Sequence, residues 1–210
     1  MLFPNTVPNA PASNASIEHR LQGPNVTFVQ RFCSAEAAFQ MACRFLEEDR
    51  ADIILTGGVD ELDPFMIEAF REMGQLRSHA AGFGEGAGIV VLEKETVARS
   101  RNARIRAAVG EVRTVGYLLP EYEKEGIDRI FGSEQEPQLV SLSGCAGEMK
   151  SILERLPAVP RLETGKLLGR SLAMGGLSLV ALAMSLPPGV SAVHYAASPE
   201  GPYYGIDFSA

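Results

Sequence analysis

The sequence predicts an α/β fold in which a parallel or mixed sheet is covered by helices on both faces. Two observations lead to this prediction. Short runs of β-branched and aromatic residues alternate along the chain with longer segments whose apolar residues recur at helical spacing. Clusters of glycine and proline separate the two kinds of segment. Strands and helices that alternate in this way usually form one layered α/β unit.

The composition indicates a globular protein of the reduced cytoplasm. The chain has 210 residues, an apolar fraction of 46% and a net charge of −7, so one domain is the default and nucleic acid or an anionic membrane is disfavoured as a partner. The cysteines Cys33, Cys43 and Cys145 are odd in number and scattered, which does not fit a disulfide framework. We expect no metal site, cofactor, signal peptide or membrane span.

The stretch from Leu21 to Asp60 predicts a strand, a sharp turn, a helix and a second strand. Residues 26–30 form the first strand, and the helix runs from Ser34, a candidate N-cap, to about Glu48. The second strand, Ile53–Leu55, leads into a glycine pair. A strand that enters a helix through a tight turn is a favoured place for a nucleophilic cysteine or serine.

The other elements continue the alternation. Asp63 is expected to cap a helix that has Pro64 at its first position. The further expected helices span 12–21, 64–73, 94–101, 121–131 (helix or loop), 148–156 and 177–184, and the strands span 89–92, 103–117, 138–142, 190–195 and 203–208.

Several motifs together resemble the β-ketoacyl synthase family of condensing enzymes, which has the thiolase fold. They are Gly23-Pro24, the turn at 31–35, Ala51–Gly58 (ADIILTGG), Gly84–Glu93 (GEGAGIVVLE) and Gly169–Gly176. The resemblance implies a thiolase-like layered αβαβα fold with mixed sheets. Residues 1–100 would be the remainder of an N-terminal half and residues 101–210 a C-terminal half of one compact unit.

The resemblance also implies positions for a cysteine and two histidines. Enzymes of the family hold an acyl chain as a thioester on the cysteine and join it to a malonyl unit on an acyl carrier protein. When the glycine motifs on both sides are set in register, Phe32 stands at the cysteine position, Ser143 at the first histidine position and Arg170 at the second. All three catalytic groups are therefore replaced. Phe32 would fill an acyl tunnel or belong to ordinary core packing.

The resemblance has a second consequence for the fold. In the family, about a third of the chain lies before the Gly-Pro motif and supplies the first strands of the N-terminal half-sheet. Here that part is missing, so the strand at 25–30 lacks its neighbour. Another chain completing the sheet, an internal start of the reading frame and a rearranged fold remain alternatives. Family dimers continue the sheet through this strand, so we expect a synthase partner or a homodimer through it.

Other residues suggest weaker alternatives. Cys33, one residue out of register, is the runner-up nucleophile, with His194 or His79 as its base. The glycines of 82–88 resemble a phosphate loop, but they precede a strand, which favours tight backbone packing. Arg170 either pairs with a carboxylate such as Glu163 or faces solvent.

A run of basic residues could meet an acidic acyl carrier protein, although a solvated face is the favoured interpretation. The run consists of Lys94, Arg99, Arg101, Arg104 and Arg106.

The sequence thus predicts a non-catalytic β-ketoacyl synthase homologue that acts as a chain-length-factor-like partner subunit in fatty acid or polyketide-type chain elongation. Two alternatives stay open. One is an active acyl-thioester transferase or thioesterase that uses Cys33. The other is a fragment without independent function.

Overall fold

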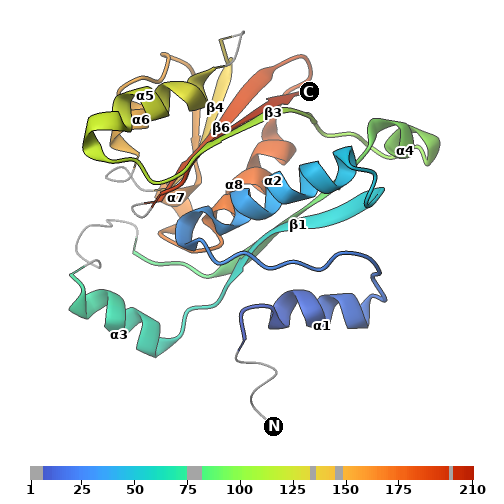
Figure 1. Ribbon diagram of the computed structural model, residues 1–210, viewed down its shortest axis with the longest axis horizontal. Helices are drawn as coiled ribbons and strands as arrows, with labels where there is room; N and C mark the ends of the chain where they lie inside the picture. Colours follow the sequence, from blue (N-terminus) through green and yellow to red (C-terminus); the bar gives the residue numbers. More distant parts are fainter. Residues whose placement is uncertain (1–6, 75–81, 133–135, 145–148, 199–200) are drawn as a thin grey trace.

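A computed structural model describes residues 7–74, 82–132, 136–144, 149–198 and 201–210. It has a mixed α/β fold, as expected (Figure 1). The helices are α1 (Ala10–Glu18), α2 (Ser34–Glu47), α3 (Pro64–Glu72), α4 (Glu95–Ser100), α5 (Glu123–Asp128), α6 (Lys150–Leu153), α7 (Thr164–Leu168) and α8 (Met174–Ser185). The strands are β1 (Ile53–Asp60), β2 (Gly86–Glu93), β3 (Ala108–Val115), β4 (Leu139–Ser143), β5 (Arg161–Glu163), β6 (Ser191–Ala197) and β7 (Tyr203–Ser209).

The larger sheet has five strands in the order β3-β7-β6-β4-β5. Strand β4 is parallel to β5 and β6, whereas β7 is antiparallel to β3 and β6, so the sheet is mixed as predicted. One face carries a core with helices α5 and α6, and the other carries a core with α2 and α8. Helices on both faces explain why six of the seven residues of β6 are buried.

The smaller sheet consists of β1 and β2, paired antiparallel from Ile53↔Glu93 to Asp60↔Gly86. Its inner face lies on the same α2–α8 layer, where Val90 and Leu92 join the core that also contains Phe39. The layers in order are therefore helices, five strands, helices and two strands (Figure 1). Within the described residues, no helix buries the outer face of the two-stranded sheet, so a fifth layer is absent there.

Close backbone contacts hold α8 against the small sheet. A Cβ atom on Gly176 would lie 2.3 Å from the carbonyl oxygen of Gly88 and 2.4 Å from the amide nitrogen of Gly58. Such approaches are shorter than real side chains allow. Glycine is therefore required where the helix meets both strands.

The predicted strand at 25–30 is wrong as a strand within this chain. Residues 21–30 are extended without sheet pairing, and Val26 and Val29 are 49% and 70% exposed. Phe28 instead turns inward and packs near Cys33. Extended backbone becomes a strand only when another strand pairs with it, and the described part of the chain offers none to this segment.

The capping predictions differ in outcome. Asp63 accepts a hydrogen bond from the N–H of Phe65 and caps α3 as expected. Ser34 is not the N-cap of α2, because that position belongs to Cys33. The Ser34 hydroxyl accepts a hydrogen bond from the N–H of Gln30 and donates one to the carbonyl of Arg31. Both bonds stabilise a short 3-10 turn over residues 31–33.

Two short elements, β5 and α7, were not predicted, and α6 is shorter than expected. None of the described helices has the length and apolar content needed to cross a bilayer.

Candidate functional site

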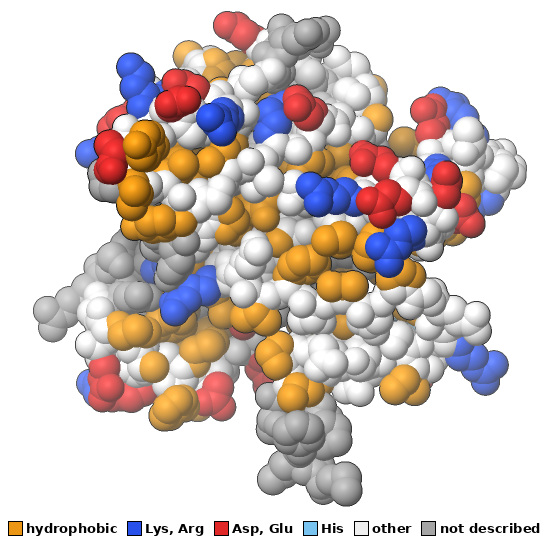
Figure 2. Space-filling model, in the orientation of Figure 1, with side chains coloured by type: hydrophobic (Ala, Val, Ile, Leu, Met, Phe, Trp, Pro, Cys, Tyr) orange, Lys and Arg blue, Asp and Glu red, His pale blue; other side chains and the backbone are white. Residues whose placement is uncertain are grey.

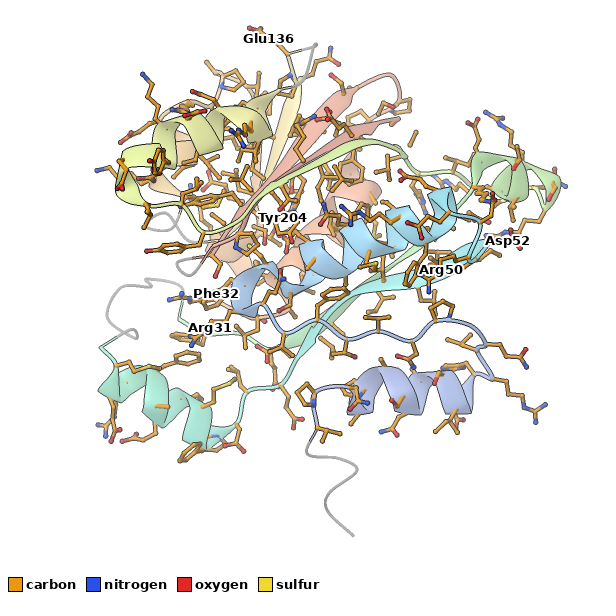
Figure 3. All side chains as sticks on the ribbon, viewed as in Figure 1. Arg31, Phe32, Arg50, Asp52, Glu136 and Tyr204 are labelled. Atoms are coloured by element: carbon orange, nitrogen blue, oxygen red, sulfur yellow. The ribbon has the colours of Figure 1, made fainter. Side chains whose placement is uncertain are left out.

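Phe32 and Arg170, predicted to replace two catalytic groups, lie in direct contact. The guanidinium carbon of Arg170 is 3.8 Å from the centroid of the Phe32 ring. Phe32 is 5% exposed and Arg170 6%, so the stack is almost closed to solvent. Figure 3 shows Phe32 at the N-terminal end of α2, beside Arg31. This arrangement is a cation–π contact in a buried setting.

The backbone around Arg170 explains its position. Its N–H donates to the carbonyl of Gly82 and its carbonyl accepts from the N–H of Gly84, which gives a parallel bridge between residues 83 and 170. A Cβ on Gly84 would lie 2.2 Å from the carbonyl oxygen of Leu168. At this position the glycine-rich segment serves tight backbone packing. Glu163, proposed from sequence as a partner of Arg170, pairs instead with Lys166 at 2.7 Å.

Ser143 ends strand β4 and is 1% exposed. It pairs in register with Ala196, which packs with Cys33 in a small buried cluster. The Ser143 hydroxyl has no hydrogen-bond partner within the described residues. All three predicted positions thus belong to the buried interior.

Cys33 is fully buried, and its thiol donates to the carbonyl oxygen of Pro202 at 3.4 Å. A nucleophilic thiol needs a base or a cation beside it and access for the substrate. The proposed base His194 has both ring nitrogens in other hydrogen bonds. His79, the other candidate base, and Cys145 lie outside the described residues. The remaining thiol, Cys43, has its pKa raised to about 11, chiefly by burial.

A buried polar network of Glu36, His194 and Ser141 was not predicted from sequence. Nε2 of His194 lies 3.0 Å from Oε1 of Glu36, and Nδ1 lies 3.0 Å from Oγ of Ser141. All three residues are 0% exposed. The network joins α2 to β6 and β4, and a Cβ on Gly175 would come within 2.4 Å of the Glu36 carboxylate.

The role of this network is structural, because its hydrogen bonds connect buried residues of three elements. A Ser-His-Glu set resembles a hydrolytic triad, but here serine faces Nδ1 and no atom of the set reaches solvent. The sequence contains one indication of this buried network, which is the position of Glu36. Glu36 lies three residues before Phe39, on the helix face that carries the apolar residues. A carboxylate on such a face needs a buried partner.

Asp60 connects the end of β1 to the segment that leads into α8. Its Oδ2 accepts from the N–H of Leu172 at 2.9 Å. Burial raises the pKa of the Asp60 carboxyl, while this bond and others from the backbone lower it in part. No group of three or more metal-ligating side chains is found in the part of the chain that the structure describes.

The basic run is largely paired with nearby carboxylates. Lys94 pairs with Asp49, and Arg101 pairs with Glu93, where two hydrogen bonds of 2.6 and 2.9 Å form. Arg99 pairs with Glu95 one helical turn away. These pairs favour a solvated face over a docking site for a carrier protein.

The first part of the chain is similar in sequence to known proteins. Residues 1–98 match the family described as β-ketoacyl synthase, N-terminal domain. The 3-oxoacyl-acyl-carrier-protein synthase 2 of Rhizobium meliloti is 33% identical over 135 residues, which are 56% of this chain and 31% of that protein. Nodulation protein E of Rhizobium meliloti is 34% identical over 117 residues, 50% of this chain and 29% of that protein. The matched stretch is about a third of each relative.

Solved structures match nearly the whole chain by fold. A type II polyketide ketosynthase, solved in complex with its acyl-carrier protein, gives a TM-score of 0.79 at 16% identity, covering 97% of this chain and 65% of that chain. The ishigamide ketosynthase/chain length factor gives 0.77 at 21% identity, covering 98% of this chain and 62% of that chain. The chain therefore spans less than two thirds of these ketosynthase chains.

Proposed function

We propose that this chain is a non-catalytic, chain-length-factor-like partner subunit of a ketosynthase. The proposal is supported by the match of residues 1–98 to the N-terminal domain of the β-ketoacyl synthase family and by the likeness of nearly the whole chain to ketosynthases in fold. Its role would lie in acyl chain elongation of the fatty acid or polyketide type. It would stabilise the catalytic partner and limit the space open to the growing chain.

The observation that carries the proposal is the stack of Arg170 on Phe32, with ring and guanidinium 3.8 Å apart. A phenyl ring cannot attack a thioester, and a guanidinium cannot serve as a general base. Ser143, at the remaining position, is buried at the end of strand β4, with an exposed fraction of 1%. The stacked side chains also occupy space in the interior, and we propose that Phe32 fills the position where an acyl tunnel would pass.

The alternative, acyl transfer or thioester hydrolysis at Cys33, has less support. The Cys33 thiol is fully buried against the carbonyl of Pro202, and His194 is held in the network with Glu36 and Ser141. Acylation of Cys33 would require the surrounding side chains to move apart.

We propose the extended segment at 25–30 as one contact with the partner. Within the described residues, no backbone group of residues 22–29 takes part in a hydrogen bond. The segment is β-favouring in sequence and exposed at Val26 and Val29. A strand from a ketosynthase or from a second copy of this chain would supply the missing ladder. We propose that an acyl carrier protein binds to the assembled complex and not to this chain alone.

Two measurements test the proposal together. The chain is co-expressed with a ketosynthase encoded beside it, and we expect co-purification and higher soluble yield or activity of that ketosynthase. Purified chain is also incubated with an acyl thioester and analysed by intact-mass spectrometry, with an active ketosynthase as positive control. We expect no acyl adduct on this chain. An adduct that disappears in Cys33→Ser would establish the alternative, and a ketosynthase equally active and soluble alone would contradict the partner role.

A further inference from the structure

Helix α1 and the residues that follow it form a hairpin-like unit. The N–H of Leu21 donates to the carbonyl of Ser16 at 2.9 Å, where the chain turns back after α1. Arg20 and Gly23 have left-handed φ angles of 53° and 108°, which such a tight reversal requires. Residues 22–29, here called the extended segment, then run beside the helix (Figure 1). Helix α1 therefore lies against the segment that we propose as a contact with the partner.

The side chain of Asn25 joins the two arms of this unit. Its Nδ2 lies 3.3 Å from the carbonyl oxygen of Ala12 and 3.3 Å from Oγ of Ser16. The Ser16 hydroxyl donates in turn to the carbonyl of Ser13 at 2.8 Å, so it accepts from Asn25. Because an amide NH2 group has two hydrogens, Asn25 makes both bonds at once and clamps the extended segment to the helix.

Helix α1 has little other support in the described structure. It spans nine residues, of which only Ala10 is buried, and its Ile17 is 76% exposed. An isolated helix of this length is marginal in water. The order of α1 and the order of the extended segment therefore depend on each other, and Asn25 supplies side-chain hydrogen bonds between them.

The two faces of the extended segment have different contacts. Phe28 packs near Cys33 at the start of α2, whereas Asn25 contacts α1. Residues an odd number of positions apart in an extended chain point to opposite faces, which agrees with these contacts. Each face is thus held by a helix, while the backbone groups of residues 22–29 make no hydrogen bond within the described part of the chain.

The surface at the extended segment is open to a partner. Val26 and Val29 are 49% and 70% exposed, and Figure 2 shows hydrophobic side chains at the surface below α2, where the segment runs. A strand that is held extended before it binds loses less conformational entropy on association. The clamped segment is therefore prepared for backbone pairing with another strand.

We propose that Asn25 is a positioning residue for strand pairing. By clamping the extended segment to α1, it holds residues 22–29 in the conformation with which a strand of the ketosynthase pairs. The inference rests on the proposed partner role and goes beyond it, because it assigns α1 and Asn25 a part in association. The clamp acts before the partner arrives, so its loss slows binding more than it speeds release.

Asn25→Ala tests the inference, because it removes both bonds to α1 and leaves the backbone of the extended segment unchanged. We expect the association rate constant with the ketosynthase, measured by biolayer interferometry, to fall by about 5- to 10-fold, with a smaller change in the dissociation rate constant. Hydrogen exchange of the free protein should accelerate in α1 and stay unchanged in β6.

Two further variants on α1 sharpen the test. Asn14→Ala, at an exposed position of the same helix, is the matched control and should bind like the unchanged chain. Ser16→Ala removes one of the two acceptors of Asn25 and should slow association less than Asn25→Ala does. Urea denaturation followed by circular dichroism should give the same free energy of unfolding for all three variants, because α1 contributes little to the core.

The outcomes distinguish this inference from the proposed function. If Asn25→Ala binds the ketosynthase with an unchanged association rate constant, the positioning role is refuted and the partner role stands. If the variant lowers the free energy of unfolding of the whole chain and changes only the dissociation rate constant, Asn25 has a structural role and the inference also fails. If the unchanged chain binds no ketosynthase, the partner role fails and the positioning role fails with it.

Discussion

The two sheets of this protein contain strands of comparable apolar content that lie in different surroundings. Strands β1 and β6 are both rich in apolar residues, yet six of seven residues are buried in β6 and one of eight in β1. The larger sheet has helices on both faces, while the smaller sheet has the α2–α8 layer on one face only. The difference shows that burial in this fold is decided by the number of layers present and not by the composition of the strand.

All five strands of the larger sheet come after residue 100, and both strands of the smaller sheet come before it. This agrees with a division into an N-terminal part, 1–100, and a C-terminal part, 101–210, which we retain as a proposal. The α2–α8 layer draws one helix from each part. Perturbing the contacts of that layer therefore tests how far the stability of each sheet depends on the other.

The largest effect is expected at His194. His194→Leu leaves the fully buried carboxylate of Glu36 without its partner and should lower the free energy of unfolding by about 3–5 kcal/mol. Urea denaturation followed by circular dichroism measures the loss. The double variant Glu36→Leu with His194→Leu removes both polar groups and should lose much less. Equal losses in the single and double variants would show that cavity or packing effects dominate, and that α2 is not held to the larger sheet by this pair.

An intermediate effect is expected at Gly176. Gly176→Ala inserts a Cβ against backbone atoms of Gly88 and Gly58, so α8 must move away from the small sheet. We expect a loss of about 1–3 kcal/mol, typical of overpacking. Hydrogen exchange should accelerate in β1 and β2 more than in β6. Gly116→Ala, where no atom lies within 4 Å of the new Cβ, serves as the control. Uniform acceleration in both sheets would show that they unfold as one unit.

The smallest effect is expected at Asp60. Burial raises the pKa of its carboxyl above the unfolded value of about 3.9. Its contribution to stability is then full below that value and is lost as the pH rises through the folded-state pKa. Asp60→Asn keeps an oxygen acceptor for the N–H of Leu172 without the charge.

The free energies of unfolding of the protein and of Asp60→Asn should therefore agree near pH 3.5 and diverge towards pH 7. The variant is expected to be the more stable by less than about 1 kcal/mol, since the group is half exposed and screened by solvent. Asp52→Asn, at an exposed position before β1, is the control. A gap that is absent at pH 7 or largest at low pH would refute the assigned cause.

Local sequence signals predicted much of this fold because they act within a few residues. Apolar spacing located α2, and Asp63 with Pro64 marked the start of α3. The strand at 25–30 could not be judged from propensity, because a strand exists only with a neighbour. The three-residue β5 has no periodic pattern to detect.

The candidate site depends on contacts between distant residues and was predicted only in part. The family motifs placed Phe32 and Arg170 at related positions, but their stacking became visible only in the fold. His194 was considered as a base for Cys33, whereas it binds Glu36 across 158 residues of sequence. A buried partner so far along the chain leaves no local trace beyond the unusual carboxylate itself.

The open edges and exposed face of the small sheet affect the amount of this protein that a cell can maintain. Within the described residues, β1 and β2 pair only with each other, and their open edges and the half-exposed aliphatic side chains can bind other extended polypeptides. Under the proposed partner role, a chain made in excess of the ketosynthase would be retained by chaperones, degraded or lost to aggregation. The same proposal predicts that the steady-state abundance of this chain follows the abundance of the ketosynthase, so that matched translation of the two proteins would be needed.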